Sequence, residues 1–188
     1  MKGNLKRWPA AALACLAFFA AGMRDRPSED ALRVGHLLRA IAAAPPGTGG
    51  AARSAEISET QLNAYIAHRL AEARPSLVRQ LTVDLLVDNH IKGRIQFDAR
   101  ALKLASLLGE RLDFDFKGIV HTRRGAGRLQ LIALELCGQR VNPQVFDFVV
   151  HTASLIYHQE PSGIEDWYEL PRGIERVVIG RARAVLHY

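Results

Sequence analysis

The strongest constraint on the fold is a run of alternating residues near the middle of the chain. Between residues 112 and 121, apolar side chains alternate with charged or polar ones, the apolar set being Leu112, Phe114, Phe116 and Val120. Alternation with a period of two places the apolar residues on one face of a β-strand. A glycine-containing turn at 124–127 and an apolar return leg at 128–137 follow. The sequence therefore predicts a long antiparallel hairpin with one buried face.

An earlier segment repeats this pattern on a smaller scale. Apolar residues alternate with polar ones from 80 to 88 and again from 91 to 98, on either side of a turn placed at Asn89–His90. Two shorter strands are expected within residues 174–188, around a turn at Arg181 and Ala182. Asp113 and Asp115 fall on the polar face of the longer hairpin, and we expect them to lie in solvent rather than to act as an acid–base pair.

Two helices are expected to lie against these hairpins. Ser58 with Gln61 three residues later is typical of a capping box, and it predicts a helix over 59–72. Asn142 followed by Pro143 predicts the start of a second helix over 143–157, which is apolar nearly all round. The fold class is therefore α+β, with long antiparallel β-hairpins forming a curved sheet wrapped around or packed on two helices. The βαβ repeats of a doubly wound nucleotide-binding fold are missing.

The N-terminal segment is typical of a secretory leader. Residues 1–22 combine a basic start, an uncharged stretch from Pro9 to Ala21 and small residues before Met23. An uncleaved anchor is the alternative, although the apolar stretch is short of the ~20 residues that span a bilayer. Residues 23–55 are expected to form a removable helical arm, with a helix over 28–44, and a Pro/Gly-rich linker. Residues 56–188 then form a single α+β domain, which either reading places outside the cytoplasm.

Composition excludes several classes of protein. A hydrophobic share of 48% and a charged share of 23% are ordinary for a globular domain. The leader holds three of the 25 basic residues, which leaves 22 against 19 acidic residues and a net charge of +3. The arginines are scattered singly apart from Arg123 and Arg124, and no basic run has interleaved aromatics, so nucleic acid is not an expected partner. The lone thiol outside the leader, Cys137, is expected to fill an apolar interior.

No motif in the sequence carries catalytic chemistry. The seven histidines form no zinc-binding spacing, so neither a metal site nor a cofactor is predicted. The glycine-rich phosphate-binding loops and the G-x-S-x-G elbow are also missing. We therefore expect no catalytic residues, although a hydrolase with an unrecognised site stays open because triads assemble from distant positions.

Three short segments resemble parts of one known superfamily. Residues 57–66 (ISETQLNAYI) resemble an opening helix, residues 137–145 (CGQRVNPQV) a strand-to-helix joint, and residues 170–177 (LPRGIERV) a closing strand. The superfamily is that of the tubular lipid-binding proteins, which includes the bactericidal permeability-increasing and SMP-type domains. The resemblance implies long antiparallel strands that wrap around a helix and leave an apolar groove for an acyl chain. It covers about residues 56–188 and supplies no fixed binding residue.

Export, architecture and resemblance together predict a protein that binds or shuttles a lipid or other apolar molecule at the cell envelope. A membrane surface is a further expected partner class, and no protein partner is named. The alternative is a non-catalytic envelope interaction module with a fully packed core, and helical spacing leaves the choice between groove and filled core open. The expected groove lining is Leu81, Val83, Leu85, Ile95, Phe97, Phe114, Phe116, Phe146, Val149, Val150 and Ala153.

Overall fold

The fold is taken from a computed structural model, which describes residues 28–44, 53–73, 77–100, 111–156 and 163–188. Within the last helix, the side chains of residues 152–156 are not part of that description. The leader expected at 1–22 and the link expected at 101–109 also lie outside the described residues.

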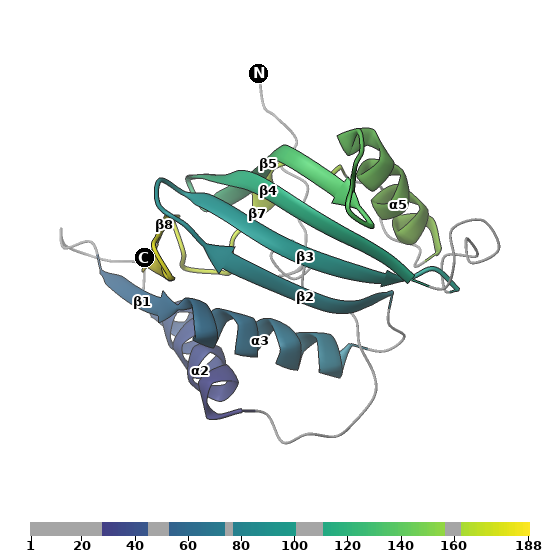
Figure 1. The fold of residues 1–188 in the computed structure, drawn as a ribbon. Coiled ribbons are helices and arrows are strands. Elements are labelled where there is room, and N and C mark those ends of the chain that lie inside the picture. The colour runs from purple at the N-terminus through teal and green to yellow at the C-terminus, as the bar shows by residue number, and fades with distance from the viewer. Residues whose placement is uncertain (1–27, 45–52, 74–76, 101–110, 157–162) are drawn as a thin grey trace.

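The described residues form three helices and two antiparallel sheets (Figure 1). A six-stranded sheet has the order β2-β3-β4-β5-β6, with β7 paired to β5, and a three-stranded sheet has the order β1-β9-β8. The helices are α2 (Glu29–Ala43), α3 (Glu59–Glu72) and α5 (Pro143–Ile156). The strands are β1 (Ser54–Ser58), β2 (Val78–Leu85), β3 (His90–Asp98), β4 (Arg111–Arg123), β5 (Ala126–Leu136), β6 (Gln139–Arg140), β7 (Tyr168–Glu169), β8 (Arg176–Gly180) and β9 (Arg183–His187).

The period-two segments form the expected hairpins. In the β2–β3 pair Leu81 lies opposite Ile95, and in the β4–β5 pair Phe116 lies opposite Leu134. Between Lys117 and Gly118 the partner moves from Ala133 to Leu131, so β5 holds one extra residue, Ile132, in a β-bulge. The first turn is centred on Asp88 and Asn89, one residue before the predicted position, and both residues have a positive φ.

The polar face of the sheet is solvated, as the alternation predicts. Arg94 Nε donates to Asp115 Oδ1 at 2.8 Å, and Gln96 Nε2 donates to Asp113 Oδ1 at 2.7 Å. The hydrogen bond to Asp115 raises the pKa of Arg94 above its ordinary value. The two carboxylates thus pair with separate cross-strand partners, which is the arrangement of a polar outer face.

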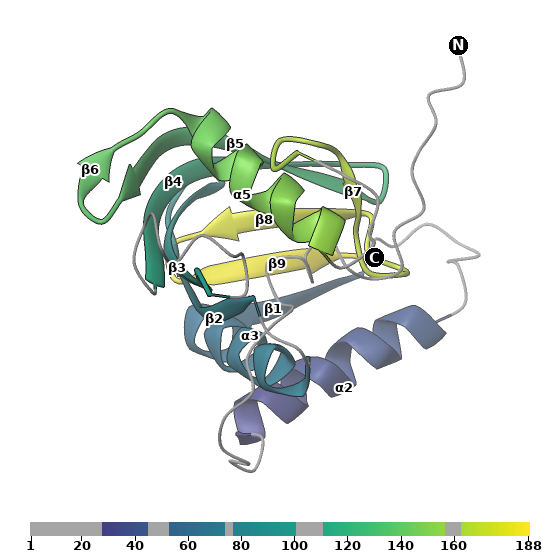
Figure 2. The same cartoon turned by 90° about the vertical axis from the view of Figure 1, so that its right-hand side faces the viewer.

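The apolar face of the same sheet curls around the main core. Residues of α3, of α5 and of the small sheet pack onto it, including Leu70, Phe146 and Ile179. Figure 2 shows α5 lying across the mouth of the curled sheet while α3 runs beneath β2. The α+β class with antiparallel hairpins is therefore confirmed, and the sheet is a strongly curled half-barrel. The two helices expected on the hairpins correspond to α3 and α5, and the third described helix, α2, was expected to be an arm.

The outer edge of β2 is closed by side chains of α3 instead of another strand. Asn63 accepts a hydrogen bond from the Val83 N–H and donates one to the Val83 carbonyl, both at 2.8 Å. Glu59 Oε2 accepts from the Leu85 N–H at 2.6 Å. The capping box of Ser58 and Gln61 is present and fixes where α3 begins, so that these side chains reach the edge. An unpaired edge is thereby satisfied within the chain.

Helix α2 packs into the structure rather than extending from it as an arm. Val34 and Ile41 are each 2% exposed and belong to a second hydrophobic cluster with Ile57 and Leu186. A Cβ atom placed on Gly173 would lie 2.8 Å from the Ile41 carbonyl oxygen, which shows how closely α2 approaches the loop before β8. The expectation of a removable arm at 23–55 conflicts with this packing, and β1 also begins inside that range.

One smaller sequence expectation is wrong. Cys137 is exposed in the β5–β6 turn with a positive φ, so it is not an apolar filler. Ile57 lies in β1, a strand that its short sequence does not reveal, and it joins the second cluster from there.

Substituting Val34 tests whether α2 is part of the core. We expect Val34→Asp to destabilise the protein by about 3–5 kcal/mol, because it places an uncompensated charge inside the second cluster. Leu32, on the same helix, is 42% exposed, so Leu32→Asp is the matched control and should cost less than about 1 kcal/mol. Urea unfolding measures both changes, and equal stabilities for the two variants would show that α2 is an arm after all.

Candidate ligand-binding site

The expected groove residues lie together in the main core. Nine of them are at most 6% exposed: Leu81, Val83, Leu85, Ile95, Phe97, Phe114, Phe116, Phe146 and Val149. Val150 is partly buried and packs against the same cluster. Ala153 belongs to the part of α5 whose side chains lie outside the described residues. Sequence spacing thus identified a set of residues that the fold brings together.

Aromatic side chains join the helix to the sheet within this set. The Phe146 ring of α5 lies 5.1 Å from the Phe114 ring and 5.7 Å from the Phe97 ring, centroid to centroid. The Phe97 and Phe114 rings are 5.9 Å apart. All three pairs are edge-on, which is the arrangement that aromatic rings prefer in a protein interior. The apolar faces of α5 and the sheet therefore contact each other directly at this point.

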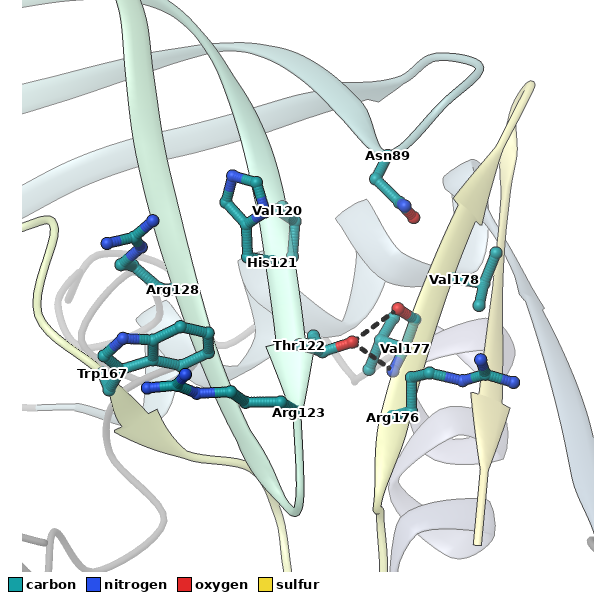
Figure 3. A pocket seen from close by; sticks show the side chains of 10 residues that line it. All are labelled: Asn89, Val120, His121, Thr122, Arg123, Arg128, Trp167, Arg176, Val177 and Val178. Carbon is teal, nitrogen blue, oxygen red and sulfur yellow. Dashed lines mark hydrogen bonds between the residues drawn. The ribbon is translucent and has the colours of Figure 1, made fainter.

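A separate pocket of about 370 Å³ opens where β4 and β5 approach β8 (Figure 3). We call it the arginine pocket. It is lined by Asn89, Val120, His121, Thr122, Arg123, Arg128, Trp167, Arg176, Val177 and Val178. Its residues come from the β2–β3 turn, both strands of the long hairpin, the segment before β7 and the small sheet. None of them was predicted as a site residue.

Asn89 joins the two sheets at one end of the pocket. Its N–H donates to the Ile179 carbonyl at 3.2 Å, and its Oδ1 accepts from the Ile179 N–H at 2.7 Å. Its own carbonyl accepts from the Val120 N–H at 2.9 Å. Asn89 has a φ of 59°, a left-handed conformation that asparagine adopts more readily than most residues. The β2–β3 turn thus makes strand-like hydrogen bonds to β8.

Thr122 continues the same junction along β4. Its hydroxyl donates to the Val177 carbonyl at 2.9 Å and accepts from the Val177 N–H at 3.1 Å (Figure 3). Both hydrogen-bonding functions of this hydroxyl are therefore used in holding β8. It is positioned as a structural bridge and not as a nucleophile.

The cationic side of the pocket is set by the β4–β5 register. His121 lies directly opposite Arg128, so these two side chains share one face of the hairpin. Arg123 follows two residues after His121 and shares that face by the strand period. The guanidinium carbon of Arg123 lies 4.0 Å from the Trp167 ring centroid, and that of Arg128 lies 5.3 Å from it. Both arginines are thus held beside one indole ring.

Charge in the arginine pocket is one-sided. No acidic side chain lines it, and no ion pair in the described part of the chain involves Arg123, Arg128 or Arg176. The Arg128 Nε atom is buried and has no hydrogen-bond partner among the described residues. Such a pocket can bind an anionic group, because guanidinium groups donate paired hydrogen bonds to carboxylate and phosphate oxygens.

Groups of metal-ligating side chains and long apolar helices were both sought among the described residues. These residues contain no group of three or more His, Cys, Asp or Glu side chains placed to hold a metal ion. None of their helices has the length and apolar character needed to cross a bilayer.

Comparison with known proteins finds no matching family model, no matching curated sequence and no matching solved structure. The resemblance to tubular lipid-binding proteins therefore stays a prediction.

Asn89 offers a test of the junction that shapes the pocket. We expect Asn89→Gly to lower the free energy of unfolding by about 1 kcal/mol, since glycine keeps the left-handed backbone but removes the hydrogen bond from the Ile179 N–H. Asn89→Ala should lower the free energy of unfolding by about 1–2 kcal/mol more, because a positive φ is unfavourable for alanine. Asn89→Asp keeps an acceptor oxygen and serves as the control. Urea unfolding midpoints rank the variants, and equal values for the glycine and alanine variants would contradict the assigned backbone strain.

Proposed function

We propose that this chain is a non-catalytic binding module of the cell envelope whose interior is filled by its own side chains and which acts through its surface. The observation that carries the proposal is the burial of the expected groove lining. Nine of the eleven residues are at most 6% exposed, and the rings of Phe97, Phe114 and Phe146 pack against one another.

The physical argument concerns what an apolar groove needs. Side chains that line an open groove have apolar surface that only the ligand covers, whereas side chains in a packed interior cover one another. Phe114 is 0% exposed and Val149 is 2% exposed, so each already has its apolar surface covered by the protein. This burial supports the interaction-module alternative over the groove.

Binding of a lipid or other apolar molecule is the second candidate, and one observation favours it. On α5, Phe148 is 59% exposed and Val145 is 36% exposed, so the helix carries apolar surface on its outward side as well. Because Phe146 packs against Phe97 and Phe114, an acyl chain could occupy the space between α5 and the sheet only if the helix moved away from these two rings. Ligand binding would on this proposal require displacement of α5.

Export is part of the proposal and has its own test. N-terminal sequencing of the mature protein should give a start at or near Met23, because the small residues before it match a signal-peptidase site. Membrane-bound material that retains Met1 would instead establish the uncleaved anchor.

Substitutions on the two sides of α5 separate a packed interior from a groove. We expect Val149→Trp to be destabilising by about 1–3 kcal/mol or more, because the larger ring has no space among its buried neighbours. Val145→Trp is the matched control on the outward side and should leave the unfolding midpoint nearly unchanged. Thermal unfolding measures both. A Val149→Trp variant as stable as the wild type, with loss of a bound fluorescent fatty acid, would favour the groove.

Native mass spectrometry provides the direct comparison. Protein purified from a membrane-bearing host should have the mass of the chain alone if the interior is packed. A retained adduct of lipid mass that Val149→Trp removes would overturn the proposal in favour of the second candidate.

A further inference from the structure

We propose that the arginine pocket binds the phosphate group of a phosphorylated ligand, with Arg123 and Arg128 as its principal ligands. The assignment deepens the proposed function, because it names the ligand class of the surface on which that function depends. It rests on the proposed function only in placing the ligand outside the apolar interior.

The first argument is uncompensated charge. Arg123 and Arg128 lie beside the same indole ring, so their guanidinium carbons are at most about 9 Å apart, the sum of 4.0 Å and 5.3 Å. Like charges at such a distance repel, and the lining holds no acidic side chain to offset them. A bound dianion would remove that repulsion.

The second argument is the buried Arg128 Nε atom. A buried N–H without a partner destabilises the folded state, and native proteins keep few such groups. Guanidinium groups can donate through Nε and one terminal nitrogen to two oxygens of the same anion. An oxyanion at this position would satisfy the group that the protein leaves unpaired.

The third argument is that the cations are held in place before a ligand arrives. Trp167 contacts both guanidinium groups, and the hydrogen bonds of Thr122 and Asn89 fix β8 and the hairpin around them. A site that is ordered in advance loses less entropy when it binds. Figure 3 shows His121 on the same side as these arginines, whereas the Arg176 side chain extends to the other side of β8. Arg176 therefore adds to the positive electrostatic potential of the pocket but does not contact the phosphate directly.

Charge balance selects phosphate over carboxylate. Two arginines carry two positive charges, which a phosphate monoester with a charge of about −1.5 to −2 near neutral pH can match. A single carboxylate would leave an excess positive charge beside Trp167. The pocket volume of about 370 Å³ suits a small phosphorylated group, since ligand pockets start at roughly 300 Å³.

Trp167 makes the proposal directly measurable. The chain has two tryptophans, Trp8 in the leader and Trp167 in the pocket. In a full-length Trp8→Phe chain, indole fluorescence reports on the pocket alone. Titration with inorganic phosphate at constant ionic strength should change this fluorescence with saturation, and chloride or acetate at equal ionic strength should not.

Charge-matched variants assign the binding to particular residues. Arg128→Gln and Arg123→Gln should each weaken phosphate binding at least tenfold, and Arg128→Lys should fall between them and the wild type because lysine lacks the planar fork. Arg181, which is exposed in the β8–β9 turn, is not part of the lining, so Arg181→Gln loses the same charge and should bind phosphate normally. Since Arg123 is exposed, its variant tests the site even if Arg128→Gln fails to fold.

Two further probes distinguish the source of the phosphate. Glycerol 3-phosphate represents a soluble ligand, and phosphatidylcholine vesicles containing phosphatidic acid represent a lipid headgroup, with phosphatidylserine vesicles of equal charge as the control. Binding to phosphatidic acid that exceeds binding to phosphatidylserine and depends on Arg128 identifies a headgroup. Binding of glycerol 3-phosphate without vesicle binding identifies a soluble phosphate ester.

Failure of the two proposals would look different. No saturable response to phosphate, equal responses to phosphate and acetate, or unchanged binding in both arginine variants would each overturn the phosphate site and leave the packed interior standing. A lipid-mass adduct removed by Val149→Trp would overturn the packed interior, whereas an Arg128-dependent phosphate response would still support the pocket.

Discussion

Covering the inner face of one curled sheet is the constraint on which the rest of the structure depends. Strands β2 to β5 present an apolar side that holds most of the main core, and a sheet of this kind is stable only when that side is covered. Three separate parts of the chain cover it: α3 through Ile66 and Leu70, α5 through Phe146 and Val149, and the small sheet through Ile179 and Ala184. The outward side needs no such cover, since cross-strand pairs such as Arg94–Asp115 keep it polar.

Single asparagine residues hydrogen-bond to the backbone at the edges of the curled sheet. Asn63 hydrogen-bonds to Val83 as a neighbouring strand would, and Asn89 does the same to Ile179. Each asparagine side chain accepts a bond from the backbone N–H of that residue, and a second bond runs to the carbonyl of the same residue. The Asn63 side chain makes both bonds because its amide carries a donor and an acceptor, whereas at Asn89 the side chain accepts and the backbone N–H donates. The two asparagines bring α3 and β8 against the sheet without a continuous ladder. The arginine pocket lies at the second of these junctions.

The sequence predicts those parts of the fold that repeat a local pattern. The alternation of Leu112, Phe114 and Phe116, and the capping box at Ser58, each depend on neighbours a few residues away, so both hairpins and α3 were predictable. Strand β1 was not, because its five residues pair with β9 at the far end of the chain. The role of α2 was missed for a similar reason. A Pro/Gly-rich stretch after a helix is typical of an arm, whereas the packing of Val34 and Ile41 depends on residues near the other end of the chain.

The candidate site likewise has one part that the sequence predicts and another part that it does not. The groove residues share strand and helix periods, so their common burial could be predicted, but whether protein or ligand covers them depends on where Phe146 meets Phe97. In the pocket, Arg123 belongs to the one pair of adjacent arginines in the sequence. Arg128 and Trp167 join it only through the β4–β5 register and the segment before β7. A filled core and a charged pocket are then two consequences of one arrangement. In the function that we propose, apolar side chains cover one another inside, and ligand recognition is left to the cations that the same hairpin presents at its end.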